Sequence, residues 1–170
     1  TLFAWRDMSV ASRLMLILEL SSITVIVYLG IRILVAVGGA EGLSAAPFRP
    51  DPSIGWWGIG YAVVFAVLSF AGFEAATTLA EETRLPGRAI PLALVGSVVL
   101  AGLFFVFASY IQVIGFGLGN VKALVASDAP LNTLALKFGT LRMATALDIA
   151  TSVSALSCVI GTVSAGARML

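Results

Sequence analysis

The chain contains no histidine and a single cysteine, and few of its residues are charged. Without histidine it can build neither a Ser-His-Asp triad nor a histidine-ligated metal site. One cysteine, Cys158, excludes a disulfide framework within the chain. The ten lysines and arginines are dispersed and leave a net charge of +1, which gives no basic surface for nucleic acid. We therefore expect no enzymatic activity, no metal, no cofactor and no nucleic-acid partner.

Apolar residues, in contrast, are abundant. They make up 59% of the 170 residues, charged residues make up 11%, and the mean hydropathy is +1.05. Soluble domains are about 25% charged, so this chain has too little polar surface to cover a soluble globule. The composition predicts an all-α, polytopic integral membrane protein that is surrounded by the lipid bilayer of the cell membrane.

Four segments reach or approach the roughly 20 mostly apolar residues that a membrane-spanning helix needs. We expect transmembrane helices within a single domain at about residues 12–38, 56–80, 90–114 and 144–168. The expected loops are residues 39–55 and 115–142 on one side of the membrane and residues 81–89 on the other. Basic residues are evenly divided between the two sides, and only their concentration in short loops favours a cytoplasmic position for residues 81–89.

Glycine and proline predict local structure at three points along the chain. The glycine-rich residues 115–120 indicate a turn at the exit of the third helix. Residues 127–130, Ser-Asp-Ala-Pro, combine a capping residue with proline and predict the start of a short surface helix. We expect Pro91 in the first turn of the third helix, where its missing N–H costs nothing.

The second segment contains a glycine, Gly72, and a carboxylate, Glu74, within an otherwise uncharged run. A carboxylate is costly in hydrocarbon, and glycine weakens a helix. One interpretation is that Gly72 lets a neighbouring helix pack closely. The other is a helix broken near residues 70–73, whose freed backbone groups bind a charged ligand. On the second interpretation the site consists of backbone groups of residues 69–73.

Two neighbouring stretches carry a resemblance to a known family. The first is Ser69-Phe70-Ala71-Gly72-Phe73-Glu74, and the second is Glu81-Glu82-Thr83-Arg84-Leu85-Pro86-Gly87-Arg88-Ala89-Ile90-Pro91. Together they resemble the sixth transmembrane helix and the following cytoplasmic loop of amino acid permeases of the amino acid–polyamine–organocation family. Residues 8–13 and 164–168 resemble the start of helix five and the end of helix eight, so the resemblance covers about helices five to eight.

The resemblance implies a five-plus-five inverted-repeat transporter bundle in which helices one and six are discontinuous around the substrate. It places residues 81–89 in the cytoplasm and the other two loops outside the cell. The substrate-binding residues that it implies are Ser69, Phe70, Ala71, Gly72, Phe73 and Glu74, with Ser157 and Gly161 at the border of the same cavity. Backbone groups around Ala71 would meet the substrate, and Phe73 or Glu74 would shape or gate the pocket.

The expected function is secondary active transport of amino acids or related amines by alternating access. Transport would be symport or antiport, with a proton or a sodium ion as the coupling ion where coupling exists. The chain begins without methionine and ends in an apolar run, so we expect an internal fragment of a longer protein. An unwound helix outside the fragment would then complete the site.

Alternatives stay open for the function of the whole chain. The same architecture could carry another substrate class, such as nucleobases or inorganic ions. The chain could also belong to a membrane scaffold or receptor subunit that transports nothing. A membrane enzyme has the least support, because the charged groups well inside the expected spans, Glu19, Arg32 and Glu74, are too few and too separated for an acid–base pair.

Alternatives also stay open for individual residues. Glu19 is either a carboxylate paired within the bundle or part of a proton or ion relay. Small residues that share one face of the fourth helix, Ser157 and Gly161 among them, form either a close helix contact or polar positions beside a substrate. The aromatic residues of 104–110 are expected to pack or to face lipid, with no site among them.

Overall fold

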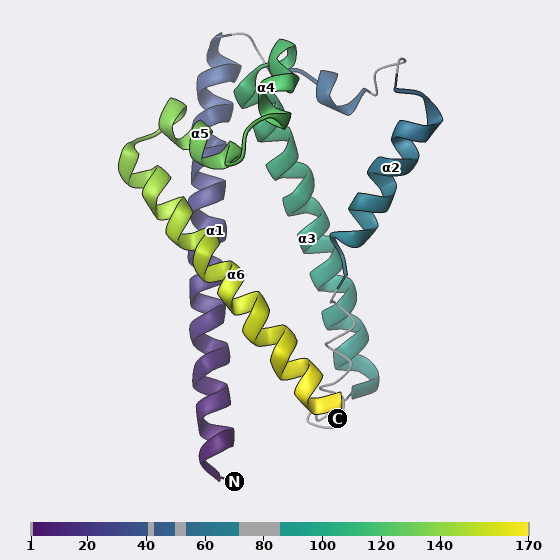
Figure 1. Cartoon of the computed structure of the whole chain (residues 1–170), viewed down its shortest axis with the longest axis vertical. Coiled ribbons are helices and arrows are strands. Elements are labelled where there is room, and N and C mark those ends of the chain that lie inside the picture. The colour runs from purple at the N-terminus through teal and green to yellow at the C-terminus, as the bar shows by residue number, and fades with distance from the viewer. Residues whose placement is uncertain (1, 41–42, 50–53, 72–85, 170) are drawn as a thin grey trace. The chain divides into compact units, whose positions relative to one another are not determined.

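Every element that the computed structural model describes is a helix, which agrees with the predicted all-α class. The description covers residues 2–40, 43–49, 54–71 and 86–169. The α-helices along it (Figure 1) are α1 (Leu2–Ala40), α2 (Gly55–Leu68), α3 (Pro86–Phe116), α4 (Val121–Val125), α5 (Pro130–Phe138) and α6 (Leu141–Met169). Two short 3-10 helices, η1 (Ala46–Phe48) and η4 (Leu118–Asn120), precede α2 and α4.

Two of the described helices are long and apolar enough to cross a membrane, namely Leu16–Gly39 within α1 and Gly87–Phe116 within α3. Two of the hydroxyl side chains in this part of α1 are satisfied within the helix. Ser21 and Thr24 each donate their hydroxyl to a main-chain carbonyl about one turn earlier, at 2.6 and 2.7 Å. Because these hydroxyls are satisfied within the helix, they need no water in a hydrocarbon environment.

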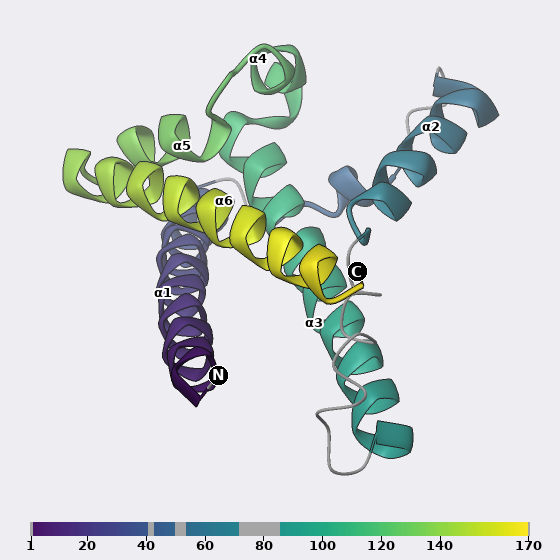
Figure 2. The ribbon, with the colours of Figure 1, turned by 60° about the horizontal axis from the view of Figure 1, so that its bottom comes forward.

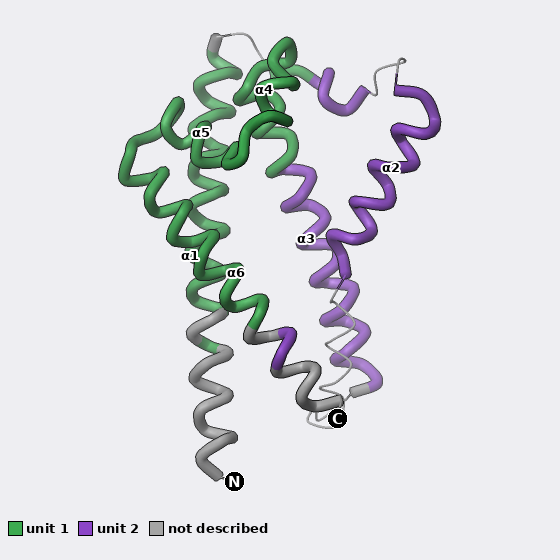
Figure 3. Tube along the Cα trace, in the orientation of Figure 1, with its two compact units in different colours: residues 1–44, 108–160 green, residues 45–107, 161–170 purple. Residues whose placement is uncertain are grey.

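The chain divides into two compact units, each of which is described by itself (Figure 3). Unit 1 consists of residues 1–44 and 108–160, and unit 2 consists of residues 45–107 and 161–170. The helix α3 therefore contributes its C-terminal turns to unit 1 and its longer N-terminal part to unit 2.

The apolar core of unit 1 lies where α1, the end of α3, α5 and the start of α6 meet. In Figures 1 and 2, α5 lies beside α1. The fully buried large side chains are Leu29, Ile33, Ile111 and Leu134. A Cβ atom added at Gly115 would lie 2.7 Å from Cδ2 of Leu134 and 3.4 Å from Cγ2 of Ile33. Glycine is therefore the residue that allows α1, α3 and α5 to approach so closely here.

Polar contacts attach α5 to the helices around this core. The ammonium of Lys137 donates to the carbonyl of Gly115 at 2.9 Å. This carbonyl lies in the last turn of α3, where carbonyls lack partners within the helix and attract a cation. The side-chain amide of Asn132 donates to Oδ2 of Asp148 at 2.7 Å and so attaches α5 to α6.

The helix α5 begins at Pro130, as the sequence predicted, but the predicted capping residue does not cap it. The N-cap position is occupied by Ala129, which makes no side-chain cap hydrogen bond. The hydroxyl of Ser127 instead lies 3.3 Å from that of Thr133. Proline at the first position favours a helix start here, because its φ is fixed near the helical value and its missing N–H would lack a partner within the helix anyway.

The expectation that Pro91 lies in the first turn of its helix is wrong. The structure begins α3 at Pro86, which takes that position, and Pro91 lies inside the helix. Its ring removes the N–H that would bond the carbonyl of Gly87. The apolar run begins only at residue 89. Hydropathy therefore indicates the start of the apolar stretch and not the start of the helix.

The predicted turn at the other end of α3 is present. The helix ends at Phe116, and Gly117 follows with a φ of 97°, a conformation that side chains rarely adopt. The N–H of Gly117 still bonds the carbonyl of Val113 at 3.1 Å. The glycine therefore lets the chain leave the helix while its N–H satisfies one of the last carbonyls.

Candidate functional site

The candidate site begins where α2 ends, immediately before the predicted break. The N–H of Ser69 makes the last α-helical hydrogen bond, to the carbonyl of Phe65 at 3.0 Å. The N–H groups of Phe70 and Ala71 then turn to carbonyls three residues back, at 3.0 and 3.1 Å. The end of α2 is therefore tightened into a turn, which frees the carbonyl of Ala66 from its α-helical donor.

The hydroxyl of Ser69 is used within its own helix. Its Oγ donates to the carbonyl of Phe65 at 2.9 Å, the same oxygen that accepts the N–H of Ser69. A hydroxyl that is satisfied in this way does not need a ligand. We therefore expect the backbone of Ser69, and not its hydroxyl, to be the group that could bind a ligand.

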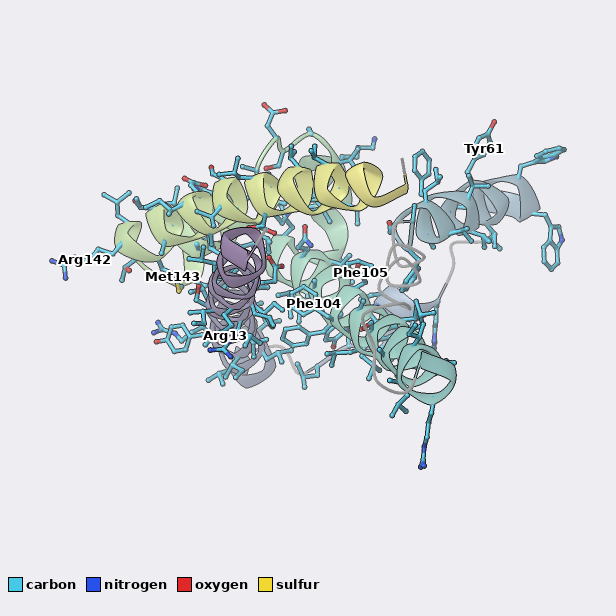
Figure 4. All side chains as sticks on the ribbon, turned by 90° about the horizontal axis from the view of Figure 1, so that it is seen from below. Arg13, Tyr61, Phe104, Phe105, Arg142 and Met143 are labelled. Atoms are coloured by element: carbon cyan, nitrogen blue, oxygen red, sulfur yellow. The ribbon has the colours of Figure 1, made fainter. Side chains whose placement is uncertain are left out.

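The side chain of Phe70 packs against α3. Its ring and the ring of Phe105 have centroids 5.5 Å apart and planes at 67°, an edge-to-face arrangement. A Cβ atom added at Gly102 would lie 3.5 Å from Cζ of Phe70. Phe104 and Phe105 leave α3 in different directions (Figure 4). The ring of Phe70 thus attaches the turn after α2 to α3.

The other predicted site residues fall into two groups. Gly72, Phe73 and Glu74 lie outside the described residues. Ser157 is half-buried within α6, and Gly161 follows about one turn later in the same helix. Ser157 belongs to unit 1, whereas residues 69–71 belong to unit 2. The grouping of all these residues around one ligand stays a prediction.

Glu19 has a partner that the sequence did not indicate. The hydroxyl of Ser154 in α6 donates to Oε2 of Glu19 in α1 at 2.9 Å. These residues are 135 positions apart, and no local pattern pairs them. The contact favours the first interpretation of Glu19, a carboxylate that is hydrogen-bonded within the helix bundle.

Replacing Glu19 with glutamine should preserve this contact, because the amide carbonyl can accept the same hydrogen bond. We expect the Tm of the purified protein to stay at the wild-type value. Glu19→Leu has no acceptor and should destabilise the protein by about 1 kcal/mol, the usual net value of one hydrogen bond. In a Ser154→Ala background, where the donor is already absent, Glu19→Leu should lower the Tm less. Loss of uptake in Glu19→Gln at an unchanged Tm would instead support the relay interpretation.

The described residues contain no group of three or more acidic or cysteine side chains that could hold a metal ion. In unit 2, the residues at the end of α2 offer main-chain groups and an aromatic ring. Such an arrangement can bind and position a ligand, and it contains no nucleophile with an adjacent base.

Comparison with known proteins gives a family match over most of the chain. A family model described as amino acid permease matches residues 13–170. The cationic amino acid transporter 1 of Arabidopsis thaliana is 62% identical over 37 residues. Those residues are 21% of this chain and 6% of that transporter, so the match covers a small part of both. No solved structure matches the chain significantly.

Proposed function

Because the chain belongs to the amino acid permease family, we propose that it is part of a secondary active transporter that moves amino acids or related amines across the cell membrane by alternating access. The main support is the family match over residues 13–170. The two helices that are long and apolar enough to cross a membrane agree with it. Transport of this kind needs binding and conformational change and no covalent chemistry.

The proposed architecture is a five-plus-five inverted repeat of which this chain supplies four spans. They correspond to about residues 12–38, 56–80, 90–114 and 144–168. The second span would be discontinuous near residues 70–73, with residues 81–89 in the cytoplasm and residues 39–55 and 115–142 outside. The tightened end of α2 supports this proposal, because it stops the regular helix at Leu68, before the predicted break.

The proposed substrate site is the segment of residues 69–74, with Ser157 and Gly161 nearby. Backbone groups released at a helix break in the membrane can bind the amino or carboxylate group of a substrate. The name of the Arabidopsis relative makes a cationic amino acid the first substrate to test. Glu74 supplies a negative charge in this segment, which would complement a cationic side chain.

The test is uptake by the full protein that carries this chain, purified and reconstituted into liposomes. We expect uptake of a labelled amino acid that unlabelled amino acids suppress and that unlabelled nucleobases leave unchanged. Separate proton and sodium gradients would identify the coupling ion. If no amino acid or amine is taken up or exchanged, the proposed function is wrong. Uptake of a nucleobase or an inorganic ion alone would support the alternative substrate class.

A further inference from the structure

We propose that Gly102 and Phe105 of α3 form a seat for the ring of Phe70, and that this seat sets the position of the turn from which the substrate segment starts. Gly102 and Phe105 are then positioning residues that act through Phe70. This inference rests on the proposed function, because it concerns the affinity of the proposed site. The three residues all belong to unit 2.

The first observation is the space that Gly102 leaves. The ring of Phe70 lies in the space beside Gly102, and its Cζ would lie 3.5 Å from a Cβ atom added there. A methyl group at this distance makes ordinary contact, whereas a larger side chain would occupy the volume of the ring. At Gly96, in the same helix and the same unit, an added Cβ would meet nothing within 4 Å. Gly96 and Gly102 therefore differ in whether another segment approaches them.

The second observation is the aromatic contact about one turn away. Phe105 meets Phe70 edge to face, with 5.5 Å between the ring centroids. Positions 102 and 105 are three residues apart and therefore lie on the same side of the helix. One contact limits how near Phe70 can come to α3, and the other gives its ring a preferred orientation. Together they restrain the ring in distance and in direction.

The third observation concerns the main-chain hydrogen bonds of the turn itself. The N–H groups of Phe70 and Ala71 bond the carbonyls of residues 67 and 68. These bonds fix the local shape of residues 69–71 but not their distance from α3. The ring of Phe70 does link this turn to α3, at Phe105 and beside Gly102. Movement of the ring would therefore move the first backbone groups of the proposed site.

The test measures KM and maximal rate of amino acid uptake in the full protein, with each rate divided by the amount of protein at the membrane surface. Gly102→Leu should raise KM about twofold to tenfold, the factor that corresponds to loss of one edge-to-face aromatic contact. Gly102→Ala should raise it less, because its methyl group fits. The matched control is Gly96→Leu, which should keep the wild-type KM.

A second pair of variants covers the case in which Gly102→Leu fails to reach the membrane. Phe105→Leu should also raise KM, and Phe105→Tyr, which keeps the ring, should recover most of the wild-type value. Phe104→Leu is the matched control and should leave KM unchanged. A purely structural role for Phe105 would lower the surface amount and the Tm without changing KM.

The outcomes separate this inference from the proposed function. Suppose that the wild-type protein takes up an amino acid and that Phe105→Leu and Gly102→Leu keep the wild-type KM. The inference that Gly102 and Phe105 position Phe70 for the site is then wrong, and the proposed transport function is unaffected. Equal effects of Gly96→Leu and Gly102→Leu would also overturn the seat, because they would show that position on α3 does not matter. Absence of uptake by the wild-type protein refutes the function itself, and the seat with it.

Discussion

Gly115→Leu should strongly destabilise the protein. A Cβ atom at this position would lie 2.7 and 3.3 Å from the two methyl carbons of Leu134 and 3.4 Å from Cγ2 of Ile33. Both side chains are fully buried, so neither can turn away into open space. Overpacking of a tight core costs about 1–3 kcal/mol, and leucine adds three more carbons beyond the Cβ. We expect the Tm to fall by about 5 °C or more.

Thermal unfolding of the detergent-solubilised protein measures this effect. Gly96→Leu is the matched control, because it makes the same change in the same helix where an added Cβ meets nothing within 4 Å. Leu134→Ala should lower stability by about 2–5 kcal/mol in the wild-type protein. In the Gly115→Leu protein the same truncation should cost much less, since it removes the side chain that is crowded. Equal Tm values for Gly115→Leu and Gly96→Leu would show that the three helices do not pack closely at Gly115.

Gly72→Leu should reduce amino acid uptake to background while the protein still inserts into the membrane. Gly72 lies outside the described residues, so the prediction rests on the sequence and on the proposed site. Leucine stabilises a helix relative to glycine and brings a bulky side chain to a position where backbone would meet the substrate. Both effects act against a ligand site that is made of released backbone groups.

Uptake by reconstituted protein, together with the amount recovered in the membrane fraction, tests this prediction. Gly60→Leu is the matched control in α2, because an added Cβ there meets nothing within 4 Å. We expect Gly60→Leu to transport at the wild-type rate. Unaltered uptake in Gly72→Leu would refute a backbone site at this position and would support the interpretation of Gly72 as a close-packing residue.

The sequence predicted the features that depend on neighbouring residues. The long apolar stretches predicted the all-α class, Pro130 the start of α5, and the glycines after residue 114 the exit from α3. It misjudged Gly115, which was taken as part of that exit turn. The structure places Gly115 within α3 against Leu134. Neighbouring glycines thus differ in role, because Gly117 adopts a positive φ and Gly115 makes room for another helix.

Contacts between distant residues could not be predicted from one sequence. Glu19 was recognised as an unusual carboxylate, but its donor Ser154 is 135 residues away. Lys137 was expected in a short surface helix, and the carbonyl that it bonds is 22 residues away. The aromatic residues near Phe105 were expected to pack or to face lipid, and only the structure identifies Phe70 as a partner. Periodicity and local motifs contain no information on such pairs.

The core of unit 1 has a consequence for the order in which the protein is assembled. Its members come from Leu29 in α1 to Leu147 in α6, so the core cannot close until most of the chain has been synthesised. Until then α1 and the end of α3 lack the apolar partners that α5 and α6 supply to this core. The sequence of α3 after Arg88 contains no charged residue that would need a partner during this interval. The short helix α5, which is made late, then joins two helices that are already in place.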